Sequence, residues 1–332
     1  MDLETVLDAV AAELNATTPR PDLKLSIIPK HLDGFFAPVV DGAENAIVEL
    51  GVDGAVNSEI FDSNEAADAV EKLMVETQVD YVQAAIDAKY DGIALAPMNN
   101  SLVPYIDAAV ESGAVTVTFD NDEPTSKRHV YIGTVNEDAG MVAAATLVRL
   151  MQSTTGTVVV LGYADTDWQA GLERTVSASD ILGTSGYNAV VVTTGWDNQI
   201  DVAALTEALQ NANPPAVGML GLFSNSYLCA TAAQSAGADD TLTIVGFDMD
   251  PETVAYMKDG LIAATHAQRL YYTGYLTAYF LTAANLLGLD KTKALFANIM
   301  VEDDVVYTGL DVVEADSLEE YSAFLSTLSS EN

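Results

Sequence analysis

Short runs of apolar and β-branched residues alternate with amphipathic stretches from about residue 23 onward. Residues 23–28 (Leu-Lys-Leu-Ser-Ile-Ile) predict a strand. The next apolar positions share one face of a helix: Phe36, Val40, Ala43, Ile47 and Leu50. Gly51 marks the end of that helix.

The same alternation continues to residue 247. Further strands are predicted at 92–96, 114–119, 157–161, 189–194, 216–220 and 242–247. The helices between them are predicted at 102–112, 137–152, 170–182, 202–212 and 225–236. Because strands buried on both faces form continuous apolar runs, this pattern predicts an α/β fold with parallel sheets and helices on both faces.

The number of these elements bears on the domain organisation. More than ten βα elements are too many for one open sheet of ordinary width, so two doubly wound sheets are predicted. The chain has 332 residues, which also favours two lobes. A closed eightfold barrel is the competing architecture at this length. Residues 1–22 predict an amphipathic helix and a Pro-containing linker, expected to be a tether without a chemical role.

Charge narrows the classes of partner. There are 49 Asp and Glu against 13 Lys and Arg, a formal net charge of −36. Binding to phosphates requires clustered Lys and Arg, so nucleic acid is excluded as a partner and anionic membranes are disfavoured. The acidic residues are spread through the chain, which suggests a solvated acidic surface adapted to high salt.

Composition is that of a globular protein, with 49% hydrophobic and 19% charged residues. Cys229 is the single cysteine, so no internal disulfide can form. His31, His129 and His266 show no paired spacing, so neither a metal nor another cofactor is expected. No apolar run reaches the roughly 18–20 residues of a transmembrane helix, and the first residues lack the features of a secretion signal. These features fit either a cytoplasmic protein or an exported one whose signal has been removed.

Candidate binding residues follow the predicted strands. Ligands of open α/β sheets bind beyond the carboxyl ends of the strands. Polar and aromatic residues found there are Asp33, Phe35, Phe36, Asp120, Asn121, Asn225 and Asp248. Carboxylates and amides bind vicinal hydroxyls, and aromatic faces cover the C–H surface of a sugar ring. Each Asp could equally be a helix N-cap, and Phe36 fits the buried stripe of its helix whereas Phe35 does not.

Three further residues are candidates on weaker grounds. Trp168 and Trp196 follow strand ends in loops, where a large aromatic side chain is less expected as packing. Arg174 has acidic neighbours and could be part of a surface ion pair of little energetic value. The sequence has no dinucleotide-binding glycine motif after a strand, no phosphate-binding P-loop and no nucleophile elbow, which weakens the hypothesis of an enzyme.

Five segments in order carry a family resemblance. They are Asp-Gly-Ile-Ala-Leu-Ala-Pro at 91–97, Ala-Val-Thr-Val-Thr-Phe-Asp-Asn-Asp at 114–122, Tyr-Ile-Gly-Thr-Val-Asn-Glu-Asp-Ala-Gly at 131–140, Ile-Val-Gly-Phe-Asp at 244–248 and Ala-Thr-His-Ala-Gln at 264–268. Together they resemble the periplasmic sugar-binding proteins of the ribose-binding type, over about residues 24–300. This family shares its core with bacterial sugar-responsive repressors.

The resemblance implies two doubly wound, Rossmann-like lobes joined by a three-crossover hinge, with the ligand in a cleft between them. It divides the chain into an N-terminal helix and linker (1–22), an N-lobe (23–127 plus 269–298) and a C-lobe (128–268 plus 299–332). The implied sugar contacts are the aromatic residues Phe35, Phe36 and Trp196, the polar residues Asp33, Asp120, Asn225, Asp248 and Gln268, and Arg174. Trp168 is added because its loop faces the cleft in this fold.

The sequence departs from the family pattern at three places. Asn225 is followed by Ser226 rather than Asp, and Arg174 is followed by Thr-Val-Ser-Ala rather than by Gly-Phe. Asn121 stands where pentose-binding members have an arginine, which argues against ribose itself.

The function that the resemblance implies is non-catalytic binding of a small neutral sugar or polyol, with hinge closure. The chain would deliver its ligand to an ABC permease or a membrane sensor, as a monomer that is periplasmic, extracellular or lipid-tethered. One alternative is the sensing core of a transcriptional repressor, but residues 1–22 contain a single basic residue, Arg20, and no basic DNA-binding helix. The other is an α/β enzyme acting on a sugar, which turnover of the bound sugar would reveal.

Overall fold

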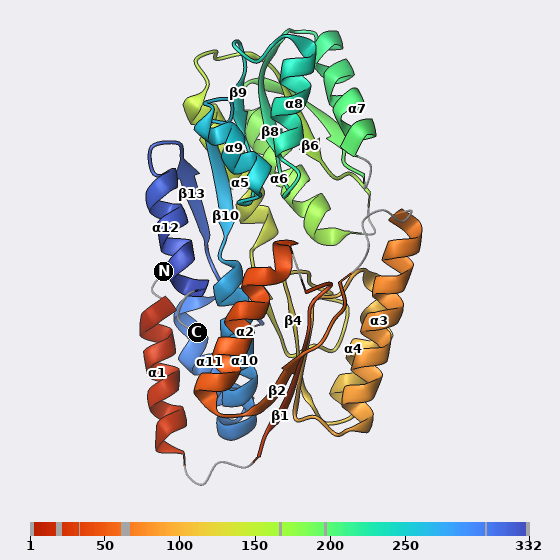
Figure 1. Ribbon diagram of the computed structural model, residues 1–332, viewed down its shortest axis with the longest axis vertical. Coiled ribbons are helices and arrows are strands. Elements are labelled where there is room, and N and C mark those ends of the chain that lie inside the picture. Colours follow the sequence, from red (N-terminus) through yellow and green to blue (C-terminus); the bar gives the residue numbers. More distant parts are fainter. Residues whose placement is uncertain are drawn as a thin grey trace. The chain divides into compact units, whose positions relative to one another are not determined.

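The polypeptide divides into two units, which are described separately here from a computed structural model (Figure 1). The structure describes residues 3–17, 22–32, 34–60, 67–165, 168–195, 198–302 and 304–329. Unit 1 comprises Met1–Thr134, Arg269–Gly309 and Thr327–Asn332, and unit 2 comprises Val135–Gln268 and Leu310–Ser326. Within the described residues, none of the helices combines the length and the apolarity that crossing a bilayer requires.

Unit 1 contains a seven-stranded sheet in the order β11-β12-β5-β4-β3-β1-β2. Its strands are β1 (Lys24–Ile28), β2 (Asp53–Val56), β3 (Gly92–Leu95), β4 (Val115–Phe119), β5 (Val130–Gly133), β11 (Met300–Glu302) and β12 (Val305–Tyr307). All neighbouring pairs are parallel except the hairpin of β11 and β12. The central strands are buried apolar runs because helices cover both faces of the sheet.

Two groups of helices enclose this sheet. One face carries α1 (Leu3–Ala16), α2 (Ala37–Leu50), α10 (Leu270–Leu287) and α11 (Leu289–Phe296). The other carries α3 (Ala67–Asp87) and α4 (Val103–Glu111). Helices α2 and α10 cross backbone to backbone: a Cβ on Gly274 would lie 1.9 Å from the carbonyl oxygen of Val39, and one on Gly42 would lie 2.0 Å from that of Tyr271. Only glycine fits at this crossing.

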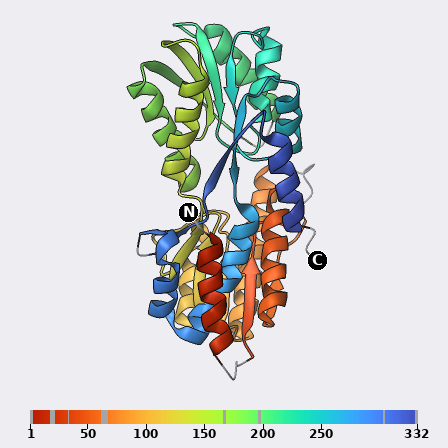
Figure 2. The same ribbon diagram turned by 90° about the vertical axis from the view of Figure 1, so that its left-hand side faces the viewer.

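Helix α1 corrects the expectation that residues 1–22 are a mere tether. It lies alongside α10 and α11 (Figures 1 and 2). Its apolar stripe, Leu3, Val6, Val10 and Leu14, is at most 5% exposed and belongs to the core of unit 1. Lys291 of α11 also pairs with Glu13 at 2.7 Å. The amphipathic pattern is therefore the signature of a helix that completes the core.

Unit 2 contains a six-stranded sheet in the order β13-β10-β9-β8-β6-β7. Its strands are β6 (Gly156–Gly162), β7 (Tyr187–Thr193), β8 (Ala216–Gly221), β9 (Thr243–Val245), β10 (Ala264–Gln268) and β13 (Leu310–Glu314). Only β13 is antiparallel to its neighbour among the described pairs. Helices α5 (Asn136–Leu150) and α6 (Gln169–Thr184) cover one face, and α7 (Asn198–Asn211), α8 (Tyr227–Ala236), α9 (Pro251–Lys258) and the start of α12 (Leu318–Ser329) cover the other.

The predicted fold class is confirmed: two mostly parallel sheets with helices on both faces, in two lobes. The barrel is excluded because the described strands form two open sheets. The expected lobe boundaries differ from the observed ones in three segments, 128–134, 299–309 and 327–332, which belong to unit 1 rather than to the second lobe. For the first two the reason is the pairing of β12 with β5, which places both in the sheet of unit 1.

Candidate functional site

Each unit places an aspartate in a left-handed backbone conformation at the same point of its sheet. Strands β4 and β9 occupy equivalent positions in the two sheet orders. Asp120 follows β4 with φ 62°, and Asp248 lies shortly beyond β9 with φ 63°. Lys89 is the one other non-glycine residue with positive φ among the described residues. Such a conformation costs roughly 1 kcal/mol or more and is characteristic of functional positions.

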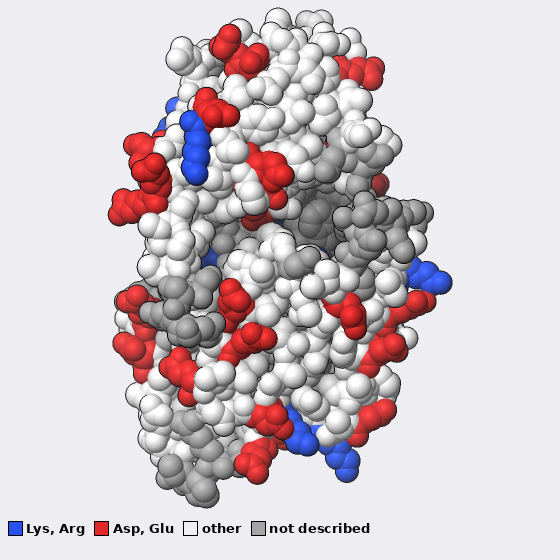
Figure 3. Space-filling model, viewed as in Figure 1, with Lys and Arg blue, Asp and Glu red and all other residues white. Residues whose placement is uncertain are grey.

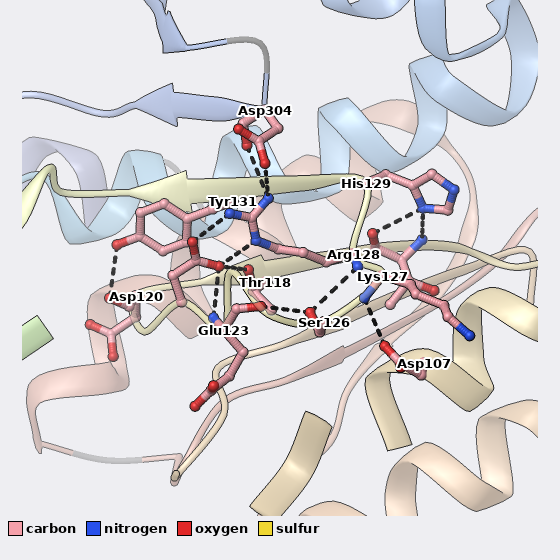
Figure 4. A network of polar contacts seen from close by, with 12 residues as sticks. Asp107, Thr118, Asp120, Glu123, Ser126, Lys127, Arg128, His129, Tyr131 and Asp304 are labelled. Atoms are coloured by element: carbon pink, nitrogen blue, oxygen red, sulfur yellow. Dashed lines mark hydrogen bonds and ion pairs between the residues drawn. The ribbon is translucent and has the colours of Figure 1, made fainter. Parts of the chain in front are cut away.

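Asp120 forms an ion pair with Lys30, which lies just beyond the carboxyl end of β1. The Lys30 Nζ is 3.6 Å from Asp120 Oδ2, and the two side chains are 14% and 9% exposed. Burial lowers the pKa of Lys30, although the neighbouring charge of Asp120 acts in the opposite direction. The Tyr131 hydroxyl donates to the carbonyl oxygen of Asp120 at 2.9 Å and so holds this turn (Figure 4).

The turn after Asp120 is built around the buried guanidinium of Arg128. This group forms a two-pronged contact with the Asp122 carboxylate, and its Nη1 donates to Asp304 Oδ2 at 2.7 Å (Figure 4). The Thr118 hydroxyl donates to the same Asp122 at 2.7 Å. Burial, together with the charge of Asp122, raises the pKa of Glu123 to about 7. Asp122 and Arg128 are thus occupied in holding the loop that carries Asp120.

Asn121 is buried and ties two strand ends together. Its Nδ2 donates to the carbonyl oxygen of Pro97, beyond β3, at 3.2 Å. This contact gives the side chain a defined structural role, and its predicted role in ligand binding stays a prediction.

The aromatic pair of unit 1 lies at the start of α2, in the 3-10 turn Gly34–Phe36. Phe36 is 3% exposed and packs edge-on against Phe35, with ring centroids 5.2 Å apart. It also packs against His31 at 4.9 Å, and Lys30 Nζ lies 6.0 Å from its ring centre. Phe35 is half-buried and packs against the hydrophobic core of unit 1, to which Phe36 belongs. The Lys30 head group therefore lies beside the Phe36 ring of this aromatic cluster.

In unit 2 the Asp248 carboxylate is 5% exposed and accepts a hydrogen bond from Gln268 Nε2 at 2.9 Å. The Thr265 hydroxyl donates to the carbonyl oxygen of Asp248 at 2.7 Å, which fixes the turn. Gln268 ends β10, the neighbour of β9, so the sheet itself brings these two predicted residues together.

Arg174 is buried rather than part of a surface ion pair, because it is only 5% exposed. Its guanidinium stacks on Phe247 at 4.2 Å from the ring centre. The Nη1 donates to the carbonyl oxygen of Leu222 at 2.8 Å, and the Nη2 donates to Asn136 Oδ1 at 2.6 Å. Helix α6, the start of α5 and the segments just beyond β8 and β9 thus meet around this cation.

Trp168 precedes α6 and packs against two rings. Its centroid is 5.2 Å from that of Tyr163 and 4.7 Å from that of Phe223. A Cβ on Gly171 would lie 2.5 Å from the Trp168 ring, so glycine at this position lets the indole lie flat on the helix. Arg174 lies 5.5 Å from the centre of the Phe223 ring, which links this aromatic cluster to the guanidinium.

Asn225 lies beyond the carboxyl end of β8, and its Nδ2 donates to the Thr194 hydroxyl at 2.7 Å. Its Oδ1 is buried and has no hydrogen-bond partner among the described residues. A buried acceptor without a donor costs about 1–3 kcal/mol, and such atoms often mark functional sites. The predicted residues Asp33 and Trp196 lie outside the described residues.

Each unit therefore gathers its own predicted residues at the carboxyl edge of its sheet. Sequence reasoning missed Lys30 and Asn136, although they follow the ends of β1 and β5 by two and three residues. In the described part of the chain no group of three or more His, Cys, Asp or Glu is placed to hold a metal ion. His266 is fully buried, with Nδ1 3.0 Å from the carbonyl oxygen of Gly246.

Residues 25–288 match the family described as "Periplasmic binding protein domain". The chain belongs to this family. Most of the sequence lies within the match, including both left-handed aspartates and the aromatic pair of unit 1. The resemblance inferred from the five sequence segments is confirmed.

Among the solved structures of similar fold are proteins described as binding sugars. A solute-binding protein of an ABC transporter from Burkholderia graminis, in complex with D-arabinose, is 25% identical, with a TM-score of 0.72, covering 92% of this chain and 99% of its own. AraP, an arabinose-binding protein from Geobacillus stearothermophilus, is 25% identical, with a TM-score of 0.71 and coverages of 91% and 99%. GanP, a glucose-galactose binding protein from Geobacillus stearothermophilus, is 24% identical, with a TM-score of 0.71 and coverages of 90% and 99%.

Proposed function

We propose that this chain is a non-catalytic receptor for a small neutral sugar or polyol, and that one ligand contacts strand-end residues of both units. The observation that carries the proposal is the matched pair of left-handed aspartates, Asp120 and Asp248, at equivalent ends of the two sheets. Ionised carboxylates form strong hydrogen bonds with vicinal hydroxyls. The backbone conformation of each aspartate is held by a hydroxyl that donates to its carbonyl oxygen.

Charge balance favours a neutral ligand over an acidic or a basic one. Each aspartate has a buried cation within its own unit, Lys30 beside Asp120 in unit 1 and Arg174 near the β9 end in unit 2. A second charge brought in by a ligand would lack a compensating partner, and burying it would be costly. Hydroxyl groups, which both donate and accept, suit such a set of carboxylates, amides and cations.

The aromatic residues support a sugar in particular. Phe35 and Phe36 in unit 1, and Trp168 and Phe223 in unit 2, form ring clusters beside the polar strand ends. Ring faces cover the apolar C–H surfaces that a pyranose or furanose exposes. The neighbour from Burkholderia graminis is described in complex with D-arabinose, which makes this pentose a first candidate.

Membership of the family suggests the physiological setting. We infer that the chain acts outside the cytoplasm as a monomer and presents its ligand to an ABC permease or a membrane sensor. Binding would favour the arrangement of the units in which both sets of residues contact the sugar. The neighbour from Burkholderia graminis is described as a solute-binding protein of an ABC transporter, and the other two as sugar-binding proteins, which favours a binding protein over the core of a repressor.

A ligand screen by thermal shift tests the proposal. The panel contains D-arabinose, D-galactose, D-glucose and a polyol, with a uronic acid and an amino sugar as charged comparisons. A ligand at 100 times its dissociation constant adds about 2.7 kcal/mol to stability, which gives a shift of several degrees. The proposal expects at least one neutral sugar or polyol to stabilise the protein and the charged analogues to have little effect.

Recovery of the bound ligand separates a receptor from an enzyme. The stabilising sugar is incubated with the protein and analysed by chromatography. A receptor returns the sugar unchanged, whereas a new product would establish catalysis and refute the proposed function. A panel in which only charged compounds stabilise the protein would refute the proposed ligand class.

A further inference from the structure

A buried carboxylate with no role in the site described above is linked to Asn225 through one intervening side chain. Asp201, in the first turn of α7, is only 3% exposed. Its Oδ2 accepts a hydrogen bond from the Thr194 hydroxyl at 2.9 Å. Both of its oxygens lie 3.1 Å from the backbone N–H of Gly195. These contacts connect α7 to the loop that follows β7.

Thr194 is the link between Asp201 and Asn225. Its hydroxyl has one hydrogen, which it donates to the Asp201 carboxylate. It can therefore only accept from Asn225, and the Asn225 Nδ2 lies 2.7 Å away in the position of that donor. The Asp201 carboxylate sets the direction of both hydrogen bonds, because an ionised carboxylate accepts and cannot donate.

The direction of these two hydrogen bonds decides which end of the Asn225 amide is available to a ligand. The two ends of an amide have nearly the same shape, so hydrogen bonding determines which way it faces. With Nδ2 bound to Thr194, the Oδ1 is the end left over, and it is the buried acceptor without a partner among the described residues. That oxygen can be satisfied only by a donor.

We propose that Asp201 is a positioning residue for sugar recognition: through Thr194 it holds the Asn225 amide so that Oδ1 accepts a hydrogen bond from a ligand hydroxyl. The inference rests on the proposed function and extends it to specificity. Outer partners that orient metal-binding side chains have a comparable effect on metal affinity. A ligand group that only accepts, such as fluorine or an ether oxygen, is rejected at this position because two acceptors would face each other.

The decisive variant is Asp201→Asn, which keeps the size of the side chain. Its Oδ1 still accepts from the backbone N–H of Gly195, and its new amide donates to Thr194. The hydrogen of the Thr194 hydroxyl is then released from the carboxylate, and we expect it to be donated to Asn225, whose amide turns over and presents Nδ2 to the ligand. The variant thus reverses the donor preference of the site without removing a ligand contact.

The first measurement is calorimetric titration with fluorinated sugars. The probes are D-arabinose, or the sugar with the largest thermal shift in the screen above, and analogues in which one hydroxyl at a time is replaced by fluorine. For the analogue altered at the hydroxyl that contacts Asn225, the wild type loses affinity by at least about tenfold, the loss of one good hydrogen bond. In Asp201→Asn this loss shrinks by at least about tenfold. An equal loss in both proteins overturns the proposal.

Two control variants exclude a purely structural role. Asp250 is also an aspartate at the start of a helix, where it caps α9 by accepting from the Glu252 N–H at 3.0 Å. Asp250→Asn keeps that cap and should leave the fluorine preference unchanged. If Asp201 only stabilised α7, Asp201→Asn would lower the melting temperature and leave the preference as in the wild type. Thr194→Val removes the hydroxyl that links Asp201 to Asn225, so it should also reduce the discrimination against the fluorinated sugar.

A second measurement requires no sugar. In ¹⁵N-labelled protein the Asn225 side-chain amide is assigned by its loss in Asn225→Asp. The hydrogen bond to Thr194 should protect one of its two protons from exchange in the wild type, and Asp201→Asn should abolish that protection. Persistence of the protection in the variant refutes the proposal. If no sugar binds, the proposed function fails, while this experiment still decides whether Asp201 orients the amide.

Discussion

His266 provides a quantitative test of the packing in unit 2. Its ring is fully buried, with Nδ1 3.0 Å from the carbonyl oxygen of Gly246 and Nε2 3.0 Å from the Thr146 hydroxyl. Because a carbonyl can only accept, Nδ1 carries the proton of the neutral ring. Burial, aided by the charges of Arg174 and Arg149, lowers the pKa of His266 to about 4.

This shift makes stability depend on pH. The unfolded chain binds a proton at His266 below about pH 6.5, whereas the folded protein does not until about pH 4, so stability is lost as the pH falls through this range. Between pH 7.5 and pH 5 the expected loss is about 2 kcal/mol, from 1.36 kcal/mol per pH unit below 6.5. Urea denaturation of the wild type and of His266→Gln, whose side chain does not titrate, isolates this contribution from that of the carboxylates.

The reasoning is refuted if the difference in unfolding free energy between wild type and His266→Gln is the same at pH 7.5 and pH 5. Proton NMR offers an independent check, since the chain has only three histidines. The His266 ring resonance should keep its neutral position down to about pH 5. A midpoint near 6.5 would mean that the ring is solvated.

Three further predictions concern Glu123, the helix crossing in unit 1 and the acidic surface. Because the pKa of Glu123 is raised to about 7 in the folded protein, stability is lost as the pH rises from about 4.5 to 7. Glu123→Gln should therefore stabilise the protein at pH 8 by about 1–2 kcal/mol and have little effect at pH 4.5. Equal effects at both pH values would contradict this. Gly274→Ala forces a methyl group against the Val39 carbonyl and should cost about 1–3 kcal/mol in denaturation, whereas Gly183→Ala, with open space around it, should be neutral or stabilising. A comparable cost for both would refute the close crossing. The Asp and Glu side chains spread over the face in Figure 3 repel one another, so the melting temperature should fall on removal of salt; a salt-independent value would contradict this.

The sequence predicted most of the fold because parallel strands buried on both faces are continuous apolar runs. Strand β4, with residues Val115–Phe119, lies at the predicted 114–119. Strands β5 and β10 were missed although most of their residues are buried. Two other missed strands lack that signature: β2 is short and half-exposed, and β12 is a three-residue strand that joins the sheet by pairing with β11 and with the distant β5. Non-local pairing of this kind leaves no periodicity in either segment.

Some residues of the candidate site could be predicted from the sequence, and others could not. Asp120 and Asp248 could be predicted because each follows an apolar strand directly, at a point where ligands bind in such folds. Lys30 could not, because a lysine in a loop is ordinarily solvated, and its burial depends on Asp120, 90 positions later. For Arg174 the residues alone left a surface ion pair open, because its burial depends on contacts with Phe247 and with the carbonyl oxygen of Leu222, both distant in sequence.

The proposal that one sugar depends on both units is tested most directly by calorimetric titration of Asp120→Asn and Asp248→Asn with the sugar identified in the thermal-shift screen. Asparagine tolerates the left-handed backbone, so each variant removes the charge while keeping the turn. Asp250→Asn serves as the matched control, and melting temperatures without ligand report on folding. Each of the two variants should weaken binding by about 2 kcal/mol or more, roughly thirtyfold, while the control binds as the wild type does. Wild-type affinity in either Asp120→Asn or Asp248→Asn, with the protein folded, would contradict the account.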